Sequence, residues 1–188
     1  MKDRFPDYIP AIERGFKRAH IGEIYMPETI MNEMNASTAF NWINYLNKKN
    51  IFLSFSASDK REAITKLVDL FADDELTSDK QNYLASVFER EELGSTGLGE
   101  AVAMPHGKCA AVKKLSVAVA RLSAPLDFDS VDKAPVKYIF MIASPVKSDT
   151  LYIKLMASII RSVKTHKICD KMDQAKSIDE AYDVLTKI

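Results

Sequence analysis

The sequence GSTGLGEAVAMPHG occupies residues 94–107 and holds four of the six glycines and one of the three histidines of this 188-residue chain. Glycine is used where the backbone needs a positive φ angle or where another group approaches the main chain closely. The apolar run at residues 101–104 predicts a brief strand, which Pro105 ends. Because proline stiffens the chain on both sides, His106 is expected on a rigid segment, where it is a candidate for proton or group transfer near neutral pH.

Regular elements are predicted on both sides of this stretch. Apolar and branched residues predict strands over residues 51–55, 115–122 and 136–143, and the last run is continuous enough to lie in the centre of a sheet. Capping patterns and helical spacing predict helices that begin near Asp59, Ser78, Ser148 or Asp149, residue 168, and Ser177. Helices that alternate with strands indicate an α/β fold.

Two helices allow more detailed predictions. The helix after Ser78 is expected to end at Arg90, immediately before the glycines. The long helix after the central strand is expected to bury a face that consists of Leu151, Leu155, Ile159 and Val163.

Residues 1–48 have a different character, because prolines divide them into short segments. Helices are predicted over residues 10–19, 27–35 and 37–46, the last with Phe40, Trp42 and Ile43 on its apolar side. We therefore expect a mainly helical N-terminal extension that packs on the main domain or on a neighbouring subunit. In the second case the protein would be a homo-oligomer. His20 is interpreted as structural, since it has no acidic or cysteine neighbour at ligand spacing.

Composition restricts the classes of partner and compartment. Basic and acidic residues balance at 26 each, which does not favour nucleic acid or an anionic membrane as a partner. No apolar run approaches the roughly 20 residues of a membrane span, so no membrane insertion is expected. The two cysteines, Cys109 and Cys169, lack a metal-type spacing and are expected as reduced thiols in the cytoplasm. The acidic segment 126–132 matches no calcium loop and is interpreted as a solvated turn.

The chemistry of His106 has several interpretations. A lone histidine after a proline is also compatible with a structural role, and the glycines lack the spacing of a P-loop or a dinucleotide fingerprint. A neutral imidazole can form an acyl or a phosphoryl adduct. The acyl route would need a nucleophile such as Cys109, but no nucleophile elbow accompanies it. The phosphoryl route needs positive charge and N–H donors, which Arg90 and the glycine-rich backbone supply, while Glu100 would orient the histidine or pair with Arg90.

Residues 90–107 closely resemble the active-site segment of the enzyme IIA proteins of the bacterial phosphoenolpyruvate phosphotransferase system (PTS), of the mannitol/fructose type (type-2 EIIA) and closest to the nitrogen-regulatory branch. The matching pieces are Arg90-Glu91, Gly94-Ser95-Thr96-Gly97-Leu98-Gly99 and Ala101-Val102-Ala103-Met104-Pro105-His106-Gly107, and the resemblance continues to the C-terminal helices. It implies a mixed β-sheet sandwiched between helices over residues 49–188, with residues 1–48 as a separate extension.

The resemblance also implies roles for individual residues. His106 would accept a phosphoryl group from an HPr-like phosphocarrier protein and pass it to a IIB domain or to a regulatory target protein. Arg90 would lie beside the histidine, and Glu100 matches a carboxylate of the mannitol-type members. The phosphate-binding loop would comprise Ser95, Thr96, Gly97 and Gly99. No metal or other cofactor is implied.

One family position departs from the pattern. The family has a second active-site histidine at the start of the helix after the central strand, and Tyr152 occupies that position here. Tyrosine donates one hydrogen bond but does not become cationic, so phosphoryl stabilisation would fall by about 1–3 kcal/mol unless Lys154 compensates. Two alternatives therefore stay open: a regulatory binding module with impaired phosphotransfer, and a sugar-specific IIA component that hands phosphate to a IIB cysteine.

Overall fold

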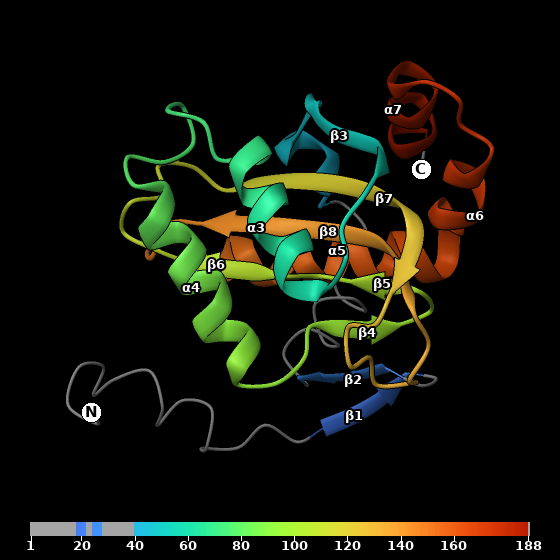
Figure 1. Cartoon of the computed structure of the whole chain (residues 1–188), viewed down its shortest axis with the longest axis horizontal. Coiled ribbons are helices and arrows are strands. Elements are labelled where there is room, and N and C mark those ends of the chain that lie inside the picture. The colour runs from blue at the N-terminus through green and yellow to red at the C-terminus, as the bar shows by residue number, and fades with distance from the viewer. Residues whose placement is uncertain (1–17, 22–23, 28–39, 188) are drawn as a thin grey trace.

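The computed structural model describes residues 18–21, 24–27 and 40–187 (Figure 1). The strands of the main domain are β3 (Leu46–Phe55), β4 (Gly97–Gly99), β5 (Val102–Ala103), β6 (His106–Lys108), β7 (Ser116–Leu126) and β8 (Val136–Ser144). Its helices are η1 (Trp42–Tyr45), α3 (Lys60–Phe71), α4 (Lys80–Glu92), α5 (Asp149–His166), α6 (Ile168–Asp173) and α7 (Ile178–Thr186).

The strands form one mixed sheet with β8 at its centre. The order is β3-β7-β8-β5-β4, and the short strand β6 also pairs with β8, beyond the end of β5. Strand β7 is antiparallel to β8, whereas β5 and β6 are parallel to it. All of β8 except Lys137 is buried, which confirms the central position that its apolar run predicted.

Side chains of β8 alternate between two hydrophobic clusters, one on each face of the sheet. Tyr138, Phe140 and Ile142 pack into a cluster with α5 to α7, and Ile139, Met141 and Ala143 pack into a cluster with α3 and α4. Figure 1 shows α3 and α4 in front of the sheet and α5 behind it. The predicted sandwich of a mixed sheet between helices is therefore confirmed.

Most helix boundaries follow the predicted caps. Asp59 caps α3 by accepting from Glu62 N at 2.8 Å, and Ser177 caps α7 by accepting from Glu180 N at 3.1 Å. The prediction for α4 was wrong by one residue, because Asp79 is the cap, as the acceptor of a bond from Asn82 N at 3.0 Å. The neighbouring Ser78 instead donates its N–H to the carbonyl of Ala111 at 3.0 Å.

Helix α5 buries Leu155, Ile159 and Val163 as predicted, but Leu151 is 47% exposed, so that part of the prediction was wrong. Tyr152, one position later, is buried in the first turn instead. No helix in the described part of the chain, α5 included, is long and apolar enough to cross a membrane.

The prediction for the N-terminal extension needs correction where the structure describes it. Strands β1 (Arg18–Ile21) and β2 (Ile24–Pro27) pair antiparallel, so Arg18, Ala19 and Pro27 lie in strands and not in the helices predicted over residues 10–19 and 27–35. Residues 10–17 and 28–35 of those predicted helices lie outside the described residues. In place of the third helix, the 3₁₀ helix η1 leads directly into β3.

The start of the main domain also precedes the predicted boundary after residue 48, which falls inside β3. Trp42 is fully buried, and its indole N–H donates to Ser162 Oγ of α5 at 3.0 Å. Residues 40–48 therefore pack with the main sheet, and the role of the preceding extension stays a prediction.

Candidate functional site

His106 is held by the central strand of the sheet. It begins β6 and lies opposite Ile142 of β8. The carbonyl of Pro105 accepts from Ile142 N at 3.0 Å, and Cys109 N donates to the carbonyl of Ser144 at 3.1 Å, so both ends of the short strand are bonded to β8. The rigid presentation expected after Pro105 therefore results from proline stiffness together with pairing to the most buried strand.

The hydrogen bond of the His106 ring defines its tautomer. Ring Nδ1 lies 2.8 Å from the carbonyl oxygen of Met104. Since a carbonyl only accepts, Nδ1 carries the hydrogen and Nε2 keeps its lone pair. Burial lowers the pKa of His106 to about 3, and the positive charges of Arg90 and Lys108 act in the same direction, whereas the bond to Met104 opposes them. The imidazole is therefore neutral at physiological pH, with Nε2 as its nucleophilic atom.

Arg90 comes to the site on the last turn of α4, as predicted. Its Nη1 donates to the carbonyl of Gly94 at 3.0 Å, which joins the helix end to the glycine-rich segment. Helix α4 packs closely on β6: a Cβ added to Gly107 would lie 3.0 Å from Val87 N and would overlap Ser86 Oγ. Glycine at position 107 therefore permits the close approach that places the guanidinium where it influences the pKa of His106.

Tyr152 lies against His106, with ring centroids 5.5 Å apart and ring planes tilted by 55°. The ammonium of Lys108 lies 4.5 Å from the Tyr152 ring centroid and forms an ion pair with Asp149. Lys108 was not predicted as a site residue from the sequence, although it lies two positions after His106 and residues two apart on a strand share a face. Lys154 had been suggested instead, but residues two apart on a helix do not face each other, so Lys154 and Tyr152 point to different sides of α5.

Glu100 differs from its predicted pairing. Its carboxylate forms an ion pair with Lys164 of α5 at 3.4 Å, and its N–H donates to Asp132 Oδ2 at 2.9 Å. The residue itself has a φ of 53°. The structure therefore ties Glu100 to α5 and to the acidic segment, and not to Arg90 as the sequence had suggested.

The predicted phosphate-binding loop uses its donors within the protein. Ser95 Oγ donates to the carbonyl of Phe128 and accepts from Gly97 N at 3.0 Å. Thr96 donates through N at 3.2 Å and through Oγ1 at 2.6 Å to the carboxylate of Glu91. Gly97 and Gly99 lie in β4, which pairs with β5. These bonds shape the segment between Arg90 and His106, and contact of its residues with phosphate stays a prediction.

Glu91 is a second residue whose part in the site was missed. Its nearly buried carboxylate also pairs with Lys60 Nζ at 3.3 Å, so it links α3, α4 and the loop. A carboxylate next to Arg90 in the sequence could have indicated such a role, since a buried charge needs a partner.

The other candidate groups lie outside this arrangement. Cys109 is buried, and its sulfur accepts from Ala111 N at 3.3 Å. In the acidic segment, Asp127 accepts from Asp129 N at 2.9 Å and Asp129 pairs with Lys60 at 2.7 Å. Among the described residues, no group of three or more His, Cys, Asp or Glu side chains could hold a metal ion.

Comparisons with known proteins agree with this architecture. Residues 44–188 match the family model "Phosphoenolpyruvate-dependent sugar phosphotransferase system, EIIA 2". The chain is 33% identical to a PTS system fructose-specific EIIA component of Haloferax volcanii, over 73% of this chain and 90% of that protein. It is 32% identical to a nitrogen regulatory protein of Bradyrhizobium diazoefficiens, over 72% of this chain and 88% of that protein.

A solved structure gives the same result. The crystal structure of nitrogen regulatory protein IIA-Ntr from Neisseria meningitidis superposes with a TM-score of 0.71 and 27% identity, over 76% of this chain and 97% of that one. The chain therefore belongs to the EIIA 2 family of the phosphoenolpyruvate-dependent sugar phosphotransferase system.

Proposed function

We propose that this protein accepts a phosphoryl group on Nε2 of His106 from an HPr-like phosphocarrier and passes it to a second protein. The observation that carries the proposal is the state of the ring: Nδ1 donates to Met104 O, the imidazole is neutral, and two cations lie close enough to lower its pKa. A neutral imidazole with an available Nε2 lone pair is the form that attacks phosphorus.

The transfer step balances without a further reactant. The Nε2 lone pair forms a bond to the phosphorus of the donor phosphohistidine, and the bond from phosphorus to the donor nitrogen breaks. The electron pair of that bond returns to the donor ring, which takes up a proton from solvent. The Arg90 guanidinium and the Lys108 ammonium stabilise the negative charge on the phosphoryl oxygens during transfer.

Access to the ring sets a condition on this step. His106 is 7% exposed, so the donor must reach it at a narrow opening or after a side-chain movement. Asp149 is largely exposed and pairs with Lys108 in this structure. We infer that the incoming phosphoryl group replaces the Asp149 carboxylate as the anion beside Lys108, and that this exchange opens the way to His106.

Lys108 also bears on the replacement of the second histidine by Tyr152. The Tyr152 ring and Asp149 hold the Lys108 ammonium on the His106 side of α5, and this ammonium supplies the positive charge that tyrosine lacks. The arrangement favours an active relay over a binding module with impaired phosphotransfer.

The branch within the family is a further part of the proposal. We favour the nitrogen-regulatory type, which acts through contacts with regulatory target proteins. The reason is that the amino acids at residues 94–97 and the C-terminal helices resemble that branch more closely. The fructose-specific relative and the nitrogen regulatory relative have similar identities, 33% and 32%, so a sugar-specific component that hands phosphate to a IIB cysteine is the second candidate. We propose that residues 1–39 contribute a contact between subunits.

Incubation with phosphoenolpyruvate, enzyme I and an HPr-like carrier tests the proposal. The wild-type protein should gain one phosphoryl group by intact mass, and the His106→Ala variant should gain none. The matched control is His166→Ala, at the end of α5, which should be labelled like the wild type. Label that persists in His106→Ala, or that is absent from a folded wild type, would refute the relay. Transfer onward to a purified IIB domain would favour the sugar-specific branch.

A further inference from the structure

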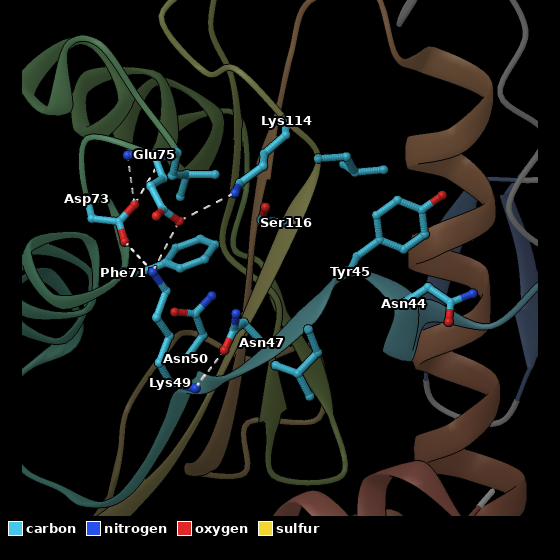
Figure 2. Close-up of a pocket in the computed structure, with 13 residues that line it drawn as sticks. Asn44, Tyr45, Asn47, Lys49, Asn50, Phe71, Asp73, Glu75, Lys114 and Ser116 are labelled. Atoms are coloured by element: carbon cyan, nitrogen blue, oxygen red, sulfur yellow. Dashed lines mark hydrogen bonds and ion pairs between the residues drawn. The ribbon is translucent and has the colours of Figure 1, made fainter.

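A polar pocket of about 230 Å³ lies away from His106, between the start of β3, the segment after α3 and the start of β7 (Figure 2). The register of the sheet places Leu46 beside Val117, Val117 beside Ile142, and Ile142 beside His106. Leu46, at the pocket, is therefore separated from His106 by three inter-strand spacings, about 14 Å in total. The pocket is a separate site that lies in line with His106 across the strands of the sheet.

The charged side chains of the pocket are paired with one another. Lys49 Nζ lies 2.7 Å from Asp73 Oδ2 and 3.4 Å from Glu75 Oε2, and Lys114 Nζ lies 3.8 Å from the same Glu75 oxygen. The hydrogen bond from Lys49 lowers the pKa of the Asp73 carboxyl. These two cations and two anions sum to zero, so the wall attracts neither a net anion nor a net cation strongly.

Two polar side chains line the deeper part of the pocket. Asn50 and Ser116 are each 8% exposed, and their polar atoms are not among the buried side-chain atoms of the described residues that lack a hydrogen bond, so any of these atoms without a protein partner is open to the pocket. Figure 2 shows the Asn50 carboxamide pointing into the pocket beside the Phe71 ring. An amide offers two donors and two acceptor lone pairs, and a hydroxyl both donates and accepts. The bonding capacity of Asn50 and Ser116 is therefore available to a ligand in the pocket.

We propose that this pocket binds a small neutral polyhydroxy molecule of monosaccharide or sugar-alcohol size. Hydroxyl groups both donate and accept, so adjacent hydroxyls match the Asn50 amide and the Ser116 hydroxyl. At the wall, hydroxyls can donate to the Asp73 and Glu75 carboxylates and accept from Lys114 without breaking the ion pairs. A charged ligand would have to displace those pairs. The volume is below the range typical of drug-sized ligands and suits a small molecule.

Nuclear magnetic resonance of the full ¹⁵N-labelled chain tests this proposal. D-mannitol and D-glucose are titrated separately, with glutamine and inorganic phosphate as the zwitterionic and anionic comparators. A saturable shift of amides at residues 46–50, 71–76 and 114–116 with at least one of the two polyols is the expected result. Absence of such shifts with both polyols, or saturable shifts of these amides with glutamine or phosphate instead, would overturn the proposal.

Two variants make the test specific. Asn50→Leu keeps the approximate side-chain volume but removes the amide, and it should weaken polyol binding by about tenfold or more. The matched control is Asn44→Leu, an exposed asparagine at the edge of the same pocket, which should bind like the wild type. Asn50→Leu should also unfold at a urea concentration close to that of the wild type, because the amide that it removes faces the pocket and is not among the buried polar groups without a hydrogen bond. A large loss of stability would show that Asn50 is a structural residue and would contradict a ligand role.

Discussion

Replacement of Lys108 by methionine should weaken phosphorylation of His106 while the fold is kept. Methionine retains an apolar chain that can pack on the Tyr152 ring but removes the ammonium that lies 4.5 Å from that ring centroid. The Lys108 side chain is mostly buried, so its charge is only partly screened by water. One hydrogen bond to a charged group contributes about 1.5–3 kcal/mol. The equilibrium constant for transfer from the carrier to His106 should therefore fall by about 10- to 150-fold.

The assay measures phosphorylated and unphosphorylated protein at equilibrium with a known ratio of phosphorylated to free carrier. Lys137→Met is a matched control, because Lys137 pairs with Asp173 at 2.6 Å and lies 5.8 Å from the Tyr138 ring centroid, at the far end of β8. It should leave the equilibrium unchanged. If Lys108→Met transfers phosphate like the wild type, or if Lys137→Met loses as much, the assignment of Lys108 to the site is refuted.

Three further predictions follow from the same geometry. In the Lys108→Met background, Tyr152→His should restore the transfer equilibrium by about tenfold, because a second imidazole can donate a charged hydrogen bond; no recovery would contradict this reasoning. Burial lowers the pKa of His106 to about 3, whereas a histidine in the unfolded chain titrates near 6.5. Between these two pH values the unfolded state binds a proton that the folded state does not. The free energy of unfolding should therefore fall by up to about 1.4 kcal/mol for each pH unit of acidification. Urea unfolding of the wild type and of His106→Gln checks this, since the variant should lack that contribution. Gly107→Ala should lower the free energy of unfolding, measured with urea, by about 1–3 kcal/mol and should slow phosphorylation. The reason is that the added Cβ pushes α4 and Arg90 away from β6. A variant as stable and as active as the wild type would rule out the close packing.

The elements that were predicted well are those with local signals. Asp59 and Ser177 cap their helices because each cap side chain and the backbone N–H that donates to it lie within four residues, and the apolar run of β8 indicates burial on both faces. Predictions failed where a distant residue decided the outcome. The N–H of Ser78 is bonded to the carbonyl of Ala111, and the cap of α4 is Asp79 instead. Residues 40–48 belong to the main domain because Trp42 is buried in its core.

The candidate site shows the same division. His106 and Arg90 were identified from one continuous stretch of sequence, and the structure brings the guanidinium close enough to influence the ring. The partner of Glu100 could not be predicted, because Lys164 comes from the far end of α5. Lys108 was missed because its significance depends on Asp149 and Tyr152, which meet it only when β6 pairs with β8.

The position of the phosphoryl group on the ring tests the central claim most directly. The protein is phosphorylated with phosphoenolpyruvate, enzyme I and an HPr-like carrier, and the His106 imidazole is examined by ¹⁵N and ³¹P magnetic resonance under alkaline conditions that preserve the N–P bond. We expect the phosphorus on Nε2, with Nδ1 still bonded to the Met104 carbonyl. A phosphoryl group on Nδ1, or on any residue other than His106, would contradict the account.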